Sequence, residues 1–81
     1  MKIRVKTFAS VRELCGFDDK ELIVSEGINI RDVLNLLKKA HKKFNDYEGT
    51  LLYAVNEEYR SMDTVLSDGD LLAVFPPVSG G

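Results

Sequence analysis

The 81-residue sequence predicts an α+β fold, in which one long helix covers one face of a mixed sheet and a C-terminal tail protrudes from the last strand. Three observations lead to this prediction. Apolar and charged residues alternate strictly near the N-terminus, which is the period of a half-buried strand. Apolar residues recur at helical spacing after Asn29. The chain ends in two prolines followed by small residues, a combination that stops strand pairing.

The N-terminal segment, residues 2–8, is expected to form the first strand. Its alternation directs Ile3, Val5 and Thr7 toward the core. The outer face then carries the remaining side chains of the strand, which are Lys2, Arg4, Lys6 and Phe8.

Two short elements are expected next. Ser10 and Glu13 have the spacing of a capping box, which predicts a short helix near 10–15 that ends at Gly16. A second strand is predicted over 20–25 because this segment is apolar and bounded by turn residues.

The main helix is predicted to begin after Asn29, a good N-cap, with Asp32 in its first turn. One apolar stripe should meet the sheet and comprises Ile30, Val33, Leu34, Leu37, Ala40, His41 and Phe44. The C-terminal end of the helix is rich in cations, which the helix macrodipole favours there: Lys38, Lys39, Lys42 and Lys43. These lysines are interpreted as a solvated helix end that could help to dock an acidic partner.

The remaining segments predict further strands joined by turns. They are a strand over 51–55, a short strand at Tyr59-Arg60, one helical turn at 63–66, a tight turn at Asp68-Gly69 and a last strand over 71–75. The final strand should lie within reach of the first. This order of strands around one long helix resembles the ubiquitin-like β-grasp fold.

Size and composition exclude several classes of function. The chain supports one modest core and is poor in catalytic groups, so we do not expect an enzyme that is active alone. No apolar run reaches the length of a membrane span, and no secretory pattern begins the sequence, so a cytoplasmic protein without membrane contact is expected. A net charge of −2 gives no basis for nucleic-acid binding. One histidine and one cysteine do not predict a metal site.

The C-terminal segment is the most informative part of the chain. We expect a domain over 1–75 and a mobile tail over 76–81. Pro76 and Pro77 lack backbone donors and restrict φ, so they should direct the tail away from the body. The tail, Pro-Pro-Val-Ser-Gly-Gly, narrows to residues without a Cβ and spans roughly 20 Å when extended, enough to enter a partner's active site.

The terminal carboxylate of Gly81 is the group for which a chemistry can be argued. A carboxylate is a poor electrophile, but an enzyme can activate it as an acyl-adenylate with AMP as the leaving group. Attack by a sulfur donor would give a thiocarboxylate, whereas attack by an amine would give an amide link to another protein. The tail contains no acid or base, so partner enzymes must supply these groups. The chain is therefore interpreted as a carrier or a substrate.

Other candidates inside the domain are weaker. Cys15 is interpreted as a small core or boundary residue rather than a reactive thiol, and His41 as a packing residue rather than a ligand. Three aromatic residues, Phe8, Tyr59 and Phe75, could form an exposed apolar docking patch at the base of the tail. For Phe75, completion of the core is an equally good interpretation.

The sequence closely resembles the small subunit of molybdopterin synthase over nearly its whole length. The resemblance rests on Val11-Arg12-Glu13-Leu14, Ala54-Val55-Asn56-Glu57-Glu58-Tyr59, Asp63-Thr64-Val65-Leu66, Asp68-Gly69-Asp70 and above all Phe75-Pro76-Pro77-Val78-Ser79-Gly80-Gly81. A bare Gly-Gly ending is shared with the thiamine sulfur carrier, ubiquitin and related modifiers. We do not expect the Pro-Pro pair in the thiamine carriers.

The resemblance implies a cycle of sulfur transfer. A ubiquitin-activating-like adenylyltransferase would use ATP and magnesium to adenylate Gly81, and a sulfur-transfer system would convert it to a thiocarboxylate. The chain itself would bind no cofactor. Its tail, including Val78, Ser79 and Gly80, would enter the large synthase subunit and donate sulfur to a pyranopterin precursor. Two sulfurs per product suit a heterotetramer with two carriers.

Two alternatives remain open at this point. The chain could be a ubiquitin-like modifier that joins Gly81 to lysines of target proteins. It could also carry sulfur for another product, such as thiamine, a thiolated tRNA base or cysteine.

Overall fold

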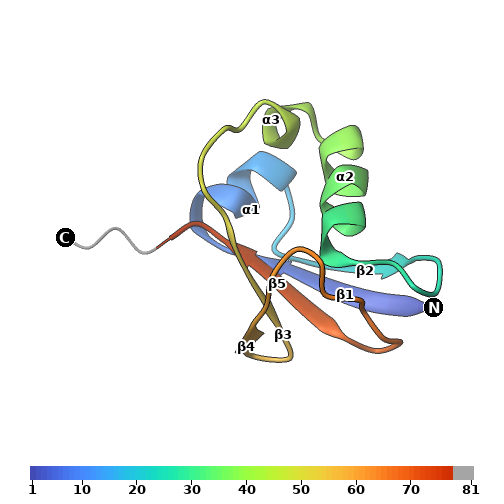
Figure 1. The fold of residues 1–81 in the computed structure, drawn as a ribbon. Helices are drawn as coiled ribbons and strands as arrows, with labels where there is room; N and C mark the ends of the chain where they lie inside the picture. The colour runs from blue at the N-terminus through green and yellow to red at the C-terminus, as the bar shows by residue number, and fades with distance from the viewer. Residues whose placement is uncertain (78–81) are drawn as a thin grey trace.

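The computed structural model describes residues 1–77 and shows a five-stranded mixed sheet with three helices packed on one of its faces (Figure 1). The elements in chain order are β1 (Lys2–Thr7), α1 (Ala9–Cys15), β2 (Asp19–Ile23), α2 (Ile30–Ala40), α3 (Lys42–Asn45), β3 (Leu52–Val55), β4 (Glu58–Tyr59) and β5 (Leu71–Phe75). The strand order across the sheet is β2-β1-β5-β3-β4. The α+β class and the ubiquitin-like arrangement predicted from the sequence are confirmed.

The two central strands, β1 and β5, run parallel, and every other pair in the sheet is antiparallel. The predicted faces of β1 are confirmed, because Ile3, Val5 and Thr7 are buried against the helices. On β5, Leu72 and Val74 complete the same buried layer. Strict alternation thus leaves one face of the sheet for the core and the other free of helices.

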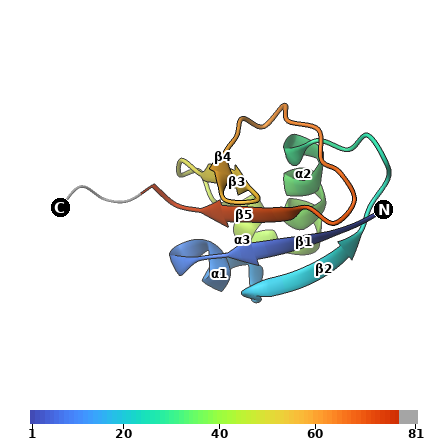
Figure 2. The ribbon, with the colours of Figure 1, turned by 90° about the horizontal axis from the view of Figure 1, so that it is seen from below.

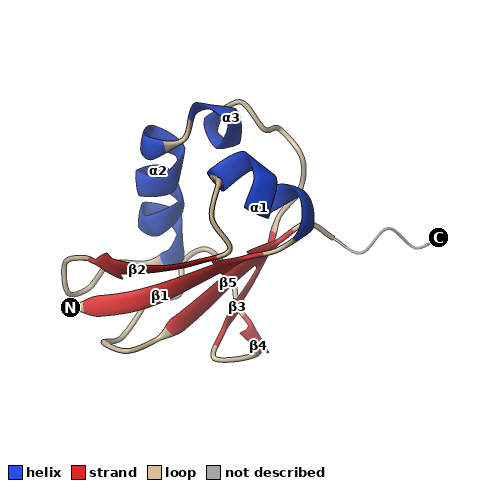
Figure 3. Cartoon of the chain, turned by 180° about the vertical axis from the view of Figure 1, so that it is seen from behind, coloured by secondary structure: helices blue, strands red, loops and turns tan. Residues whose placement is uncertain are grey.

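The prediction that the main helix continues its apolar stripe to Phe44 is wrong. Helix α2 ends at Ala40, His41 adopts an extended conformation with φ −131°, and α3 restarts at Lys42. Figure 3 shows α1, α2 and α3 together on one side of the sheet, with α3 turned from α2 toward α1. The break allows Phe44 to be fully buried. In a straight helix, this ring would lie two turns beyond Leu37 and so farther along the helix axis. Ala40, predicted on the buried stripe, is exposed at the break.

The predicted capping box of α1 is also wrong. The helix begins at Ala9, its N-cap is Phe8, and no side chain caps it. The cause is the abrupt turn from β1 into α1, in which Ala9 takes a positive φ of 51° and places Val11 and Cys15 in the core. The predicted stop is confirmed, because Gly16 is left-handed with φ 76° and donates its N–H to the carbonyl oxygen of Arg12 at 2.8 Å.

The segment after β4 forms no helical turn, in contrast to the prediction for residues 63–66. It runs extended beside the start of α2: the N–H of Ile30 donates to the Thr64 carbonyl at 3.1 Å, and Leu66 donates to the Ile28 carbonyl at 2.9 Å. These bonds bury Leu66 and satisfy a helix N–H that has no partner within α2. A local capping signal at Asp63 is thereby overridden by long-range pairing.

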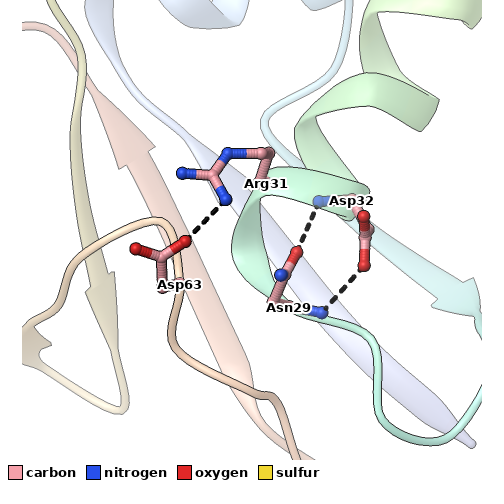
Figure 4. Close-up of polar contacts among 4 residues, drawn as sticks. All are labelled: Asn29, Arg31, Asp32 and Asp63. Atoms are coloured by element: carbon pink, nitrogen blue, oxygen red, sulfur yellow. Dashed lines mark hydrogen bonds and ion pairs between the residues drawn. The ribbon is translucent and has the colours of Figure 1, made fainter.

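The N-terminus of α2 has the cap that the sequence predicts. The side chain of Asn29 accepts from the N–H of Asp32 at 2.8 Å, and the Asp32 carboxylate accepts from the N–H of Asn29 at 3.3 Å (Figure 4). The Arg31 guanidinium pairs with Asp63 at 2.5 Å and adds a second link to the extended segment (Figure 4).

Replacing Asn29 by alanine should lower the free energy of unfolding by about 1 kcal/mol, because an N–H at the start of α2 loses its acceptor. Urea unfolding followed by circular dichroism measures this loss. Asn35→Ala is the matched control: Asn35 is exposed within the same helix, where alanine has the higher helix propensity, so stability should be unchanged or slightly raised. Equal losses in both variants would contradict the capping role.

Candidate functional site

The predicted docking residues lie together on the face of the sheet that carries no helix. Figure 2 shows that β5 leads directly into the C-terminal segment, with β1 and β3 at its sides. Phe8 follows β1, Phe75 ends β5 and Tyr59 ends β4. We call these three residues the aromatic patch.

The rings of the aromatic patch are in contact with one another. Phe8 and Phe75 meet edge to face, with ring centroids 6.3 Å apart, and Tyr59 lies 5.8 Å from Phe75. Phe75 is half-buried between its neighbours, whereas Phe8 is 47% exposed and Tyr59 is 72% exposed. Exposed aromatic rings held by one another keep their apolar area available to a partner at a low entropic cost.

Strand register explains why residues so distant in sequence meet here. In the parallel pair, Thr7 lies opposite Val74, so the next residues, Phe8 and Phe75, leave the sheet side by side. On the other side of β5, Ala73 pairs with Ala54, and Ala54 pairs with Tyr59. Because Ala54 and Ala73 have small side chains, they do not cover the rings of the aromatic patch.

Left-handed backbone flanks the aromatic patch. Among the described residues, the non-glycine residues with positive φ are Ala9, Asn56 and Glu57. Ala9 follows Phe8, and the other two form the turn that returns the chain toward Tyr59. Asn56 is held there by its side chain, which donates to Asp70 at 2.9 Å and accepts from the N–H of Leu71 at 3.0 Å. Positive φ at both central residues is the geometry that a two-residue hairpin turn requires, so Asn56 and Glu57 fix the return of the chain to Tyr59.

The described part of the tail continues from the patch. Pro76 is half-buried and Pro77 is exposed, and neither residue extends β5. The other residues predicted to act in the tail, Val78, Ser79, Gly80 and Gly81, lie outside the described residues. The division into a domain and a tail, and the mobility of that tail, stay predictions.

One part of this surface was missed in the sequence analysis. A shallow hollow of about 390 Å³ adjoins Tyr59 and is lined by Leu51, Leu52, Tyr53, Tyr59, Arg60, Ser61 and Met62. Leu52 lies directly opposite Phe75 and so extends the apolar surface of the patch. The sequence predicted a strand over 51–55 without assigning its faces, and only the register shows that Leu52 adjoins Phe75.

Two groups inside the domain behave as predicted. Cys15 is buried, and desolvation by burial raises its pKa to about 11, which disfavours the thiolate. His41 is half-buried, with its ring 5.8 Å from that of Phe17, and its Nε2 has no hydrogen-bond partner within residues 1–77. No cluster of three metal-ligating side chains occurs in the described part of the chain. None of the described helices is long and apolar enough to cross a membrane.

The fold and the aromatic patch at the exit of the last strand define a ubiquitin-like β-grasp protein. The chain belongs to the ThiS family, whose profile matches residues 5–81. It is 36% identical to the molybdopterin synthase sulfur carrier subunit of Chlamydomonas reinhardtii, and the alignment covers 100% of both chains.

Solved structures agree with this assignment. A structure from Pyrococcus furiosus, described as molybdopterin converting factor, subunit 1, has a TM-score of 0.85 and 42% identity, with 96% of this chain and 99% of that chain covered. The small archaeal modifier protein 1 of Haloferax volcanii has a TM-score of 0.82 and 26% identity, with 95% and 98% covered. The fold is thus shared by one protein named as a molybdopterin converting factor subunit and one named as a modifier protein.

The Cys15 thiol should resist alkylation in the folded protein. A rise of the pKa from 9.0 to about 11 lowers the thiolate fraction at pH 8 by about two orders of magnitude, and burial restricts access further. The rate of iodoacetamide labelling, followed by mass spectrometry, should rise with pH until the pKa is passed. Labelling of the urea-unfolded chain is the control. Equal rates in the folded and unfolded chains at pH 8 would contradict an inert, buried thiol.

Proposed function

We propose that this chain is the sulfur carrier subunit of a molybdopterin synthase and that its Gly81 carries the sulfur as a thiocarboxylate. The observation that carries the proposal is the aromatic patch at the base of the Pro76-Pro77 exit, on the face of the sheet without helices. This geometry lets a partner hold the body while the tail reaches into its active site. The full-length likeness to named sulfur carrier subunits supports the same conclusion.

The proposed reaction has three steps at Gly81. The carboxylate attacks the α-phosphate of ATP, with magnesium bound by the partner enzyme, and gives the acyl-adenylate and pyrophosphate. A sulfur donor then displaces AMP and leaves the thiocarboxylate. The thiocarboxylate sulfur then attacks the pyranopterin precursor, and water cleaves the acyl–sulfur bond, which leaves the sulfur on the product and regenerates the carboxylate. The carrier supplies a slim terminus and a recognised body, and its partners supply every acid and base.

We propose two partners in the cytoplasm, the large subunit of the synthase and a ubiquitin-activating-like adenylyltransferase. The name of the relative, a subunit of molybdopterin synthase, supports the first. Both partners need the tail, and the patch is the apolar surface nearest to it, so both should bind the same rings. The two complexes are then mutually exclusive. Two sulfurs per product suit a heterotetramer with two carriers.

Deleting Gly81 should abolish adenylation and sulfur loading without changing the fold, because the deletion leaves the core intact. Intact-mass spectrometry after incubation with ATP, the adenylyltransferase and a sulfur donor detects the exchange of one oxygen for sulfur. The folded state is checked by circular dichroism. Gly80→Ala should also impair transfer, because it adds a Cβ in a channel shaped for backbone, whereas Cys15→Ser should leave transfer near normal. Sulfur loading by the truncated chain would exclude the carrier role.

Phe75→Ala should weaken binding to both partners by about 30-fold, which corresponds to a hot spot of about 2 kcal/mol. The affinities are measured by isothermal titration, and stability is measured in parallel because Phe75 is half-buried. Ile23→Ala is the matched control, since Ile23 is exposed on the same face of the sheet but far from the patch. A ternary complex in which one carrier binds both partners at once would refute the shared surface.

Conjugation is the alternative that the same terminus allows, and the likeness to a small archaeal modifier protein favours testing it. Incubation with ATP and extract of the native host separates the two functions. A sulfur carrier stays at its own mass apart from the oxygen-to-sulfur exchange. A modifier yields a ladder of higher-mass products that depends on Gly81.

A further inference from the structure

The lysine cluster at the junction of α2 and α3 is the charged feature that the carrier function leaves unexplained. Lys38, Lys39, Lys42 and Lys43 lie within six residues of one another. Without them the eleven cationic residues of the chain fall to seven, against thirteen acidic ones. The cluster is therefore a local positive region on an otherwise acidic protein, and such a region attracts an acidic partner.

The helix macrodipole explains only part of this cluster. Lys38 and Lys39 occupy the last turn of α2, where cations are stabilised, but Lys42 and Lys43 belong to the separate helix α3. Within residues 1–77, only Lys42 of the four has an acidic partner, Asp46, at 3.6 Å on the surface. The positive charge of the cluster is thus left largely uncompensated by the described part of the domain.

Three of these lysines line a hollow next to an exposed leucine. The hollow has a volume of about 550 Å³ and is lined by Asn35, Leu36, Lys38, Lys39, Lys42 and Asn45. Leu36 is 48% exposed and is the large apolar side chain on the surface of α2. Lys43 does not line the hollow, so the cluster divides into lysines inside and outside it.

A second hollow continues the first along α2. It measures about 810 Å³ and lies between the helix and the segment around the end of β2. Its lining includes the apolar residues Ile23, Val24 and Ile28 and the acidic residues Glu26 and Asp32. Asn35 and Leu36 line both hollows, which therefore form one groove. At the end near β2 the groove combines apolar residues with the acidic Glu26 and Asp32. It has Leu36 at its middle and is basic at the end near α3.

This groove lies on the helical side of the molecule, whereas the aromatic patch lies on the opposite face of the sheet. Figure 3 shows α2 and α3 on one side of the sheet, and β5 ends at Phe75 of the aromatic patch. A partner held by the aromatic patch therefore leaves the groove open to another protein.

We propose that the groove binds an extended segment of a partner protein, in which apolar side chains are followed by acidic ones. The apolar residues would cover Leu36 and the end near β2, and the acidic residues would pair with Lys38, Lys39 and Lys42. A nucleic acid fits less well, since the rest of the chain would repel it and its backbone would not use Leu36. The inference does not depend on the chemistry of Gly81.

The test uses the full chain and a synthetic peptide of three leucine or isoleucine residues followed by four glutamates, titrated while amide shifts are recorded by ¹⁵N NMR. Saturable shifts are expected at the groove, at Leu36, Lys39 and Ile28, and not at Phe8 or Tyr59. A peptide with glutamines in place of the glutamates should bind at least about tenfold more weakly, because it lacks the charges.

Matched variants separate the groove from general attraction. Lys39→Glu should weaken peptide binding about tenfold, whereas Lys43→Glu, with the same change in net charge but outside the hollow, should weaken it less than about threefold. Leu36→Ala should weaken peptide binding about fivefold. Val65→Ala, at an exposed residue outside the groove, should leave peptide binding unchanged. Unchanged amide spectra outside the substituted site verify that each variant is folded.

Four outcomes would overturn the proposal. They are the absence of saturable shifts at millimolar peptide, equal effects of Lys39→Glu and Lys43→Glu, the same shifts with inorganic phosphate alone, and concentration-dependent shifts at the groove without peptide. The third would identify a general anion site, and the fourth would identify a second copy of this chain as the occupant.

Discussion

The parallel pairing of β1 with β5 is the interaction on which the rest of the structure depends. It joins the first and last strands at the centre of the sheet and aligns Thr7 with Val74. The core then forms from the buried side chains of both strands and the three helices. The same register brings Phe8 beside Phe75 at the end of the last strand. The hydrogen bonds between β1 and β5 therefore both stabilise the fold and position the aromatic patch.

The sheet separates two kinds of surface. Its helical face is sealed by buried side chains from α1, α2 and α3, including Phe44, which the break at His41 brings into the core. Its other face keeps large rings exposed, although covering them would stabilise the isolated domain. The left-handed residues Ala9, Asn56 and Glu57 frame these rings and add to the cost. A protein whose C-terminus must be bound by partner proteins has a physical reason to keep such a surface exposed.

The prediction succeeded where a signal is local. Alternation in residues 2–8 located the first strand and its buried face, and Asn29 with Asp32 located the start of the main helix. The prediction failed where local and long-range preferences compete. Apolar periodicity continued through His41 to Phe44, but α2 ends at Ala40 and the chain turns into α3, which buries Phe44 in the core. The capping signals at Ser10 and Asp63 were overridden by the turn at Ala9 and by pairing with the start of α2.

The candidate site likewise has a part that the sequence predicted and a part that depends on long-range contacts. The sequence by itself predicted a chemistry for the terminus, because the order Phe-Pro-Pro-Val-Ser-Gly-Gly can be read without knowledge of the fold. It also suggested that Phe8, Tyr59 and Phe75 could form one exposed patch. Only the tertiary structure decided that these rings touch, that Leu52 adjoins them and that Leu36 lies beside three lysines in a groove. Contacts between residues up to 67 positions apart follow from strand register, which no local pattern encodes.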